Sequence, residues 1–401
     1  MAFNPNGIFY TSYNPAELNA RSFAASVLKM WPNGSWPLFG LTSQMPTHRA
    51  VATTHSYFTK TMSFPTLRIN AGAGYAAGIT VFVVDSTVGV VPNQVFEIPG
   101  TREHVRIVSV DSATQVTVAR GYGRVVAGAV VDNEDLFAVG NSHEEASNRP
   151  VALGMAAVYV PNYTQIFRNA WALSDTARAS LAEAGYNNVA ENRQDCMKFH
   201  SVDIESALLF GQAVAPTGTP PRHATQGIID SIYQYAPANV KVAGATTTMS
   251  QLTAMLEPMF EFQSDAGSAK ERLILADAQA MRVFHEIGRL YGQVTLDQKE
   301  TSFGMMFSEF KFYKGILRLV EHPLLNGITL ANGIAIVIDL NTMALAYMDG
   351  RDVKKEEYDS SKDSTNSGQD AVGGSLLSEL ATEFRMPQAS GIITNLTAGA
   401  A

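Results

Sequence analysis

The longest regular pattern of apolar and polar positions runs from Asn187 to Val214, a stretch without proline. Apolar residues return there every fourth position, which is the repeat of one face of an α-helix. About 24 helical residues at 1.5 Å each make a rod of roughly 36 Å, long enough to span a domain. Because its opposite side is polar, we expect the rod to lie across a sheet and to bury one stripe: Cys196, His200, Ile204 and Leu208.

Both ends of this predicted rod carry boundary signals. Asn188 is followed three residues later by Glu191, which is the spacing of a capping box. Acidic side chains in the first turns favour the positive end of the helix dipole. Pro216 and Gly218 end the pattern.

Residues 66–140 have a different character, with short Val-rich runs separated by Gly, Asp, Ser and Pro. Apolar and polar residues alternate from His104 to Val110, as in a half-buried strand. Several strands at such spacing predict a small antiparallel barrel or sandwich inserted as a unit. Gly72–Gly74 is interpreted as a loop. A dinucleotide-binding fingerprint would need a third glycine at a different position and a following helix.

The rest of the chain mixes both periodicities, so we expect an α+β fold. Helices are predicted over Asp175–Ala184 with Ser174 as N-cap, Asp230–Tyr235, Thr248–Phe260 and Ala276–Tyr291. Strands are predicted within Glu300–Val320, over Gly333–Asp339 and Asn341–Tyr347, and at the end over Gly391–Leu396 as an edge strand. The pattern of Leu376–Pro387 fits a strand or a short helix, and hydrophilic Lys354–Gly374 is expected to be mobile or ordered by a partner.

The first 60 residues are rich in Asn, Pro, Ser, Thr and aromatics, and Ala16–Met30 is their one helical segment. Such an arm cannot bury its aromatic side chains by itself. It is either a loosely attached terminus or an arm that lies on a neighbouring subunit. We favour the second interpretation, with these contact candidates, which would otherwise face water: Trp31, Trp36, Phe39, Tyr57 and Phe58.

Composition narrows the class of protein. A chain of 401 residues suggests two or three domains, and 46% hydrophobic residues are ample for their cores. Only 16% of the residues are charged, which is typical of proteins that cover part of their surface with partners. A net charge of −8 argues against a nucleic-acid-binding surface, which would be basic.

The cellular compartment follows from what the sequence lacks. Cys196 is the single cysteine, so no disulfide can form within the chain, and we expect assembly in a reducing cytosol. The N-terminal residues show no signal-peptide pattern. No uncharged apolar run reaches about 18 residues, so no membrane span is predicted.

Candidate catalytic chemistry is sparse, and we predict no enzyme, cofactor or metal site. The eight histidines show no zinc-binding spacing, and the chain has no nucleophile elbow or P-loop. Cys196 and His200 fall on the buried helix face, where packing is the simpler interpretation. Glu144 and Glu145 could serve glycosidase chemistry, but adjacent loop acids are more often a solvated or inter-subunit face.

The order of parts resembles the major capsid proteins of tailed bacteriophages, which have the Hong Kong 97-like fold. Four stretches, from about residue 100 to the end, carry the resemblance through their shared order: Val105–Asp111 with Thr117–Gly123; Pro161–Phe167; Asp203–Gly211 leading to Gly227–Ile229; and Met386–Ala389 with Gly391–Leu396. The resemblance implies a subunit that self-assembles into the icosahedral head shell of a virion and encloses the DNA genome without sequence-specific binding.

The same resemblance implies a division of the chain. Residues 1–60 would be the N-terminal arm, and 61–165 the extended loop carrying the inserted β domain at about 66–140. Residues 166–220 and 346–401 would form the peripheral domain with its spine helix, and 221–345 the axial domain. The protein's partners would be its own copies, as hexamers and pentamers. Scaffolding, portal and decoration proteins remain open as further partners, and the host cytoplasm is the expected site of assembly.

Two alternative classes remain. One is another self-assembling structural protein, such as a tail-tube subunit or a bacterial cargo compartment. Tail tubes are mostly β and lack so long a helix, whereas cargo compartments rarely carry the β insertion. The other class is a hydrolase on a β-rich scaffold. A hydrolase would need convergent acids or a nucleophile with a base, and the sequence offers neither.

Overall fold

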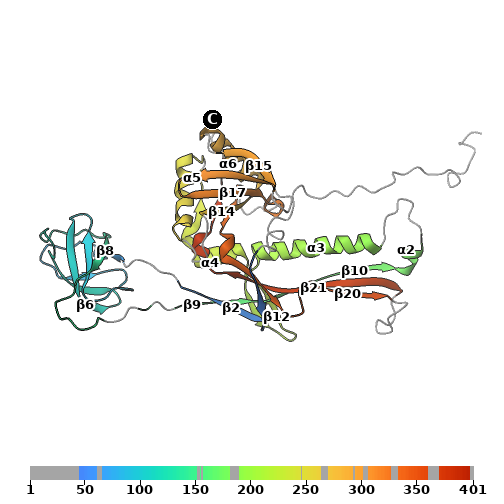
Figure 1. The fold of residues 1–401 in the computed structure, drawn as a ribbon, viewed down its shortest axis with the longest axis horizontal. Helices are drawn as coiled ribbons and strands as arrows, with labels where there is room; N and C mark the ends of the chain where they lie inside the picture. The colour runs from blue at the N-terminus through green and yellow to red at the C-terminus, as the bar shows by residue number, and fades with distance from the viewer. Residues whose placement is uncertain are drawn as a thin grey trace, which may run out of the picture. The chain divides into compact units, whose positions relative to one another are not determined.

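The structure is a computed structural model (Figure 1). It describes residues 45–60, 66–150, 154, 157–180, 189–244, 246–262, 270–291, 294–300, 306–326, 333–359 and 370–397. The chain forms two compact units, residues 1–57 with 159–401 and residues 58–158, and each is described by itself. The second unit approximates the extended loop predicted from the sequence.

The unit of residues 58–158 is a six-stranded antiparallel barrel, as the Val-rich runs predict. Its strands follow the order β3-β8-β5-β6-β7-β4, and a bridge between Ile69 and Val84 joins the two outer strands. Closure of this kind removes exposed strand edges. The strands are β3 (Thr66–Arg68), β4 (Val81–Val83), β5 (Gln94–Ile98), β6 (Glu103–Ser112), β7 (Gln115–Ala119) and β8 (Asp135–Asn141). Their inward side chains form one core that includes Leu67, Phe82, Phe96, Ile107 and Leu136.

The other unit contains a five-stranded sheet built around β21 (Ala371–Phe384), a strand of 14 residues. Along one edge β21 pairs antiparallel with β10 (Gln165–Ser174). Along the other edge it pairs first with β20 (Lys354–Asp359) and then with β19 (Met343–Met348). A short strand, β1 (Thr47–Ala50), adds in parallel to β19.

The predicted rod is α3 (Val189–Phe210), which lies along β10 and β21 (Figure 1). The whole predicted stripe, Cys196, His200, Ile204 and Leu208, is buried. His200 is a packing residue: its Nδ1 lies 2.7 Å from Asn169 Oδ1 on β10, and its Nε2 lies 2.8 Å from Ser378 Oγ on β21. At 22 residues and 1.5 Å each, the helix is roughly 33 Å long.

This unit also contains a seven-stranded sheet, whose strand order is β13-β22-β18-β14-β17-β16-β15. Its central strand β14 (Glu271–Ala276) sends Leu273 and Leu275 to the core shared with α3 and α4 (Ile228–Tyr235). Ile274 and Ala276 point to the other core, shared with α5 (Met249–Leu256) and α6 (Ala278–Tyr291). Cover on both faces explains why residues 273–276 of β14 and the neighbouring strand Ala335–Ile338 are apolar at every position. The remaining strands are β13 (Val240–Val242), β15 (Val294–Glu300), β16 (Met306–Phe312), β17 (Gly315–Glu321), β18 (Ala335–Ile338) and β22 (Gly391–Thr394).

Several smaller elements complete this unit. β2 (Thr54–Thr59) pairs with β9 (Val158–Tyr163), and β11 (Val214–Thr217) pairs with β12 (Arg222–Ala224). Short helices are α7 (Pro323–Asn326) and the 3₁₀ turns Pro237–Asn239, Leu340–Thr342 and Pro387–Ala389. Among the helices that the structure describes, none is both long and apolar enough to cross a bilayer.

Two predicted helices are shorter than expected. Ser174 caps α2 (Asp175–Ala179) by accepting a hydrogen bond from Ala177 N, and the helix ends at Ala179 because Ser180 is extended. The rest of the predicted helix, residues 181–184, lies outside the described residues. Thr248 caps α5 through a capping box with Gln251. After Leu256 the helix tightens into a 3₁₀ turn over Glu257–Phe260, which contains Pro258. Proline lacks the N–H that an α-helical bond would need.

The sheet topology corrects two expectations about strands and decides a third that the sequence left open. β22 is not an edge strand, because it lies between β13 and β18. It therefore belongs to the sheet formed by residues of the 221–345 segment. Lys354–Asp359, expected to be mobile or partner-ordered, is the strand β20, held by six register pairs with β21. Leu376–Pro387 continues as strand to Phe384, which decides between the strand and helix alternatives.

Candidate assembly surfaces

The predicted arm contacts fall in different places. Trp31, Trp36 and Phe39, together with the helix predicted before them, lie outside the described residues. Phe58, on β2, is 66% exposed. Tyr57 is 6% exposed, so the expectation that it faces water is wrong. Burial raises its pKa, against the opposing effect of a backbone hydrogen bond at Phe384.

The segment that contains Tyr57 is anchored to its own unit by an ionic cluster that the sequence analysis missed. Glu383 on β21 is buried, and its carboxylate lies 2.6 Å from His55 Nε2 and 2.6 Å from Arg385 Nη2. Burial alone would raise the pKa of Glu383, but the hydrogen bonds from His55 and Arg385 outweigh it and lower the pKa to about 2. Arg49 and Asp349 form a further ion pair beside β1. Residues 47–59 are therefore fixed to the five-stranded sheet.

Glu144 and Glu145 are exposed on the loop that follows β8, which agrees with a solvated or contact face. Cys196 is buried, and burial raises the pKa of its thiol, so the unreactive protonated form is favoured. Among the described residues, no group of three or more His, Cys, Asp or Glu side chains is arranged to hold a metal ion.

The barrel contains a second buried ionic centre, between Glu103 and Arg120. Arg120 Nε and Nη2 donate to Glu103 Oε1 and Oε2 at 2.7 and 2.8 Å, and both side chains are buried. The same carboxylate accepts hydrogen bonds from Gly121 N at 2.8 Å and Gly128 N at 3.0 Å. Burial alone would raise the pKa of Glu103, but these four donors outweigh it and lower the pKa below its usual range. The pair thereby fixes the loop that follows β7.

A third buried pair ties the spine helix to the seven-stranded sheet. Glu205 Oε1 on α3 lies 2.7 Å from Nε2 of His322, which follows β17, and both side chains are fully buried. His322 Nδ1 accepts a hydrogen bond from Leu324 N, so the proton of the neutral ring is on Nε2, facing the carboxylate. This contact fixes the C-terminal half of α3 to the segment that follows β17.

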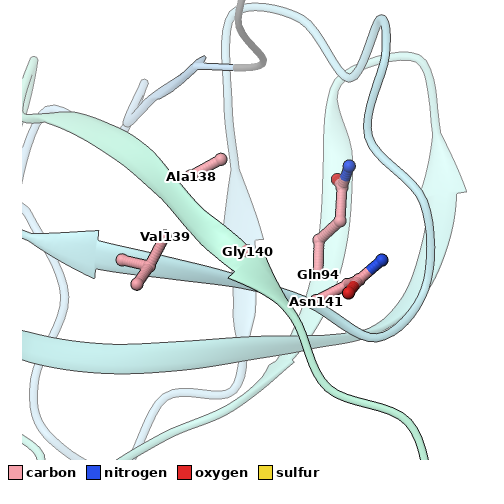
Figure 2. A pocket seen from close by; sticks show the side chains of 5 residues that line it. All are labelled: Gln94, Ala138, Val139, Gly140 and Asn141. Atoms are coloured by element: carbon pink, nitrogen blue, oxygen red, sulfur yellow. The ribbon is translucent and has the colours of Figure 1, made fainter.

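Figure 2 shows a pocket of about 300 Å³ on the barrel. A register shift between Val95 and Phe96 against β8 creates a bulge, and residues 138–141 border the pocket. Gln94 also lines it, but its Oε1 already accepts a hydrogen bond from Val91 N. The lining residues, Gln94, Ala138, Val139, Gly140 and Asn141, include no titratable side chain, so this pocket is not suited to acid–base chemistry.

The three buried charge clusters described above thus hold loops, strands and the spine helix, while apolar side chains such as Phe58 remain at the surface. These features are those of an α+β structural subunit.

A family model described as SU10 major capsid protein matches residues 9–397, so the chain belongs to the SU10 major capsid protein family. The chain is 44% identical over 402 residues to the major capsid protein of Pseudomonas phage PaMx41, covering 97% of this chain and 96% of that protein. Similar solved structures include that of Gordonia phage Cozz, with 10% identity, 96% and 93% coverage of the two chains and a TM-score of 0.47. Another is the capsid of a native GTA particle, with 8% identity, 97% and 98% coverage and a TM-score of 0.46.

Family membership decides between the alternatives left by the sequence. The function is that of a phage major capsid protein, a component of the virion, and not that of a tail-tube or cargo-compartment protein. The α+β class is confirmed, and the long spine helix, the inserted β unit and the two large sheets agree with the expected Hong Kong 97-like organisation. The family is one of structural capsid proteins.

Proposed function

We propose that this chain assembles with its own copies, as hexamers and pentamers, into the icosahedral shell of a tailed-phage head. The observation that carries the proposal is the family match over residues 9–397. In such a shell each subunit makes heterologous contacts whose rotation closes into rings. Individual contacts can be weak because each subunit makes many of them.

The parts of the chain take the roles expected from the resemblance. Residues 1–60 are the N-terminal arm, 61–165 the extended loop, 166–220 and 346–401 the peripheral domain and 221–345 the axial domain, except that β22, within 346–401, completes the axial sheet. The anchoring of residues 47–59 supports a refinement, in which the part of the arm that reaches a neighbour precedes residue 47. Trp31, Trp36 and Phe39 lie in that part, and Phe58, Glu144 and Glu145 are further contact candidates.

The contents and partners of the shell follow from the same proposal. A net charge of −8 suits a thin shell that encloses DNA without gripping its sequence. Scaffolding, portal and decoration proteins are proposed as partners during assembly in the host cytoplasm.

The test is to express the full chain and image the purified protein by negative-stain electron microscopy. Closed icosahedral particles are the expected result, whereas small monodisperse species under all assembly conditions would overturn the proposal. A triple variant, in which Ser replaces Trp31, Trp36 and Phe39, tests the role of the arm. Val51→Ser is the control, because Val51 is 88% exposed on the anchored segment. The triple variant should fold but assemble poorly, and the control should assemble normally. Equal assembly of both variants would show that the arm aromatics are not contacts.

A further inference from the structure

The pocket on the barrel lies over the bulge in β8. The register between β5 and β8 skips Val139, which is therefore the extra residue of the bulge. A Cβ on the next residue, Gly140, would meet no atom within 4 Å, so the space over this backbone is open. Two amide side chains, Gln94 on β5 and Asn141 on β8, border the same space from neighbouring strands (Figure 2).

These two amides keep hydrogen-bonding capacity for a ligand. Gln94 is only 8% exposed, and its Oε1 accepts a hydrogen bond from Val91 N at 3.0 Å. Its Nε2 has a long contact of 3.5 Å to Gly89 O. Asn141 is exposed, and among the described residues no hydrogen bond engages its side chain. Asn141 thus offers two N–H donors and an acceptor, and Gln94 adds a weakly bonded donor group.

Hydrogen bonds join the pocket to a polar rim made of Asn93, Arg106, Tyr122 and Ser142. Asn93 and Ser142 are the chain neighbours of the two amide residues, and Ser142 N donates to Asn93 O at 2.9 Å. Ser142 Oγ lies 2.5 Å from the Tyr122 hydroxyl. Arg106 Nη1 donates to Asn93 Oδ1 at 2.7 Å, and its guanidinium carbon lies 5.6 Å from the centre of the Tyr122 ring. These contacts hold the rim, including the 45% exposed Tyr122, beside the pocket.

A sugar ring is the class of ligand whose groups match this set of side chains. Each hydroxyl of a sugar both donates and accepts, and an amide side chain also does both. Tyrosine combines an apolar ring with a polar tip, which suits the C–H face and the hydroxyl edge of a sugar. At about 300 Å³ the pocket is at the lower limit for small-molecule sites, so it has room for about one ring.

The charges of the site argue against ions as ligands. Neither the pocket lining nor the rim contains a carboxylate, so a cation would meet no opposite charge. Arg106 is the one formal charge of this set, but its Nη1 is engaged by Asn93 and its Nε is buried. A small anion would therefore have a single, partly engaged cation as its partner.

We propose that the pocket and its polar rim bind one ring of a saccharide. This binding goes beyond the proposed function, because assembly of a shell does not by itself give the pocket a ligand. The same ring chemistry occurs in free sugars and in the glycans of a bacterial surface, and the experiment below distinguishes the two sources.

The test is saturation-transfer NMR on the purified full chain. Because the site is complete within one chain, the result does not depend on whether shells form. The probes are glucose, galactose, mannose and N-acetylglucosamine as free sugars, and purified bacterial lipopolysaccharide as a surface glycan. At least one probe should bind, and Asn141→Ala should weaken its binding by about tenfold, because the hydrogen bonds of one amide are lost.

The control is Asn70→Ala, which removes an exposed asparagine of the same barrel outside the pocket and the rim and should leave binding unchanged. Binding of lipopolysaccharide that Asn141→Ala weakens supports the inference with a surface glycan as the source. Binding of free sugars alone, with the same loss, supports it with a free sugar. Absence of binding for every probe, or equal binding by Asn141→Ala and Asn70→Ala, would overturn it. Should Asn141→Ala not fold, Tyr122→Leu gives the same readout.

Discussion

Replacing Glu103 by Gln should destabilise the barrel strongly, because it removes the negative charge that faces a buried guanidinium. Arg120 loses a bidentate partner with contacts of 2.7 and 2.8 Å, and the Gly121 and Gly128 amides lose their charged acceptor. Breaking a buried ion pair from one side costs about 3–5 kcal/mol. At roughly 0.05–0.15 kcal/mol per residue, a unit of about 100 residues has about 5–15 kcal/mol of stability in total. The substitution therefore removes between about a fifth and all of that stability.

Hydrogen exchange measured by mass spectrometry on the full chain resolves this effect within the barrel. Exchange protection should fall throughout residues 66–141 and remain unchanged on α3. Asp135→Asn is the matched control, because its ion pair with Arg68 is exposed and spans 3.9 Å, so it should cost less than about 1 kcal/mol.

The acid dependence of the same centre gives a second check. The folded-state pKa of Glu103 is lowered, so its stabilisation is present above the unfolded pKa and disappears as the pH falls through the folded pKa. The unmodified barrel should lose protection in that acidic window, whereas Glu103→Gln should lack this component. Equal protection of Glu103→Gln and Asp135→Asn at neutral pH would refute the reasoning.

Three further predictions concern the other unit. Lowering the pKa of Glu383 from 4.5 to about 2 corresponds to about 3 kcal/mol of stability in total, which the contacts of His55 and of Arg385 share. This stability is present above pH ~4.5 and is lost as the pH falls towards 2. Exchange at residues 54–59 should report this loss, and Glu383→Gln should exchange rapidly without the acid transition. Leu208→Ala in the spine should lower the free energy of unfolding of the unassembled chain, measured with denaturant, by about 2–5 kcal/mol. Met197→Ala on the same helix should lower it by less than about 1 kcal/mol, because Met197 is 43% exposed. Similar losses for the two variants would contradict the assigned helix face. Gly374→Ala should lower the melting temperature, because the added Cβ would lie 2.7 Å from Glu356 O and 2.9 Å from Trp171 Nε1. An unchanged melting temperature would mean that β20 can move away from the added methyl group.

The candidate surfaces were only partly predictable from the sequence. The exposure of Glu144 and Glu145 agrees with their residue type and loop position. Phe58 is exposed although it is an apolar residue on β2, as expected for an aromatic side chain that its own chain does not cover. The burial of Tyr57 could not be predicted from its neighbours in the sequence, because it depends on β21, which follows more than 300 residues later. The sequence around Glu103 and Arg120 does not indicate that they form an ion pair, because their contact requires β6 and β7 to be in register.

Local patterns in the sequence determined the elements themselves. The four-residue repeat of α3, the alternation along β6 and the caps at Ser174 and Thr248 involve neighbours within a few residues, so the chain specifies them by itself. Only the tertiary structure decided that Lys354–Asp359 becomes a strand and that β22 lies inside a sheet. The physical reason is that a strand completes its hydrogen bonds with partners distant in the sequence, and local polarity does not encode which partner it meets.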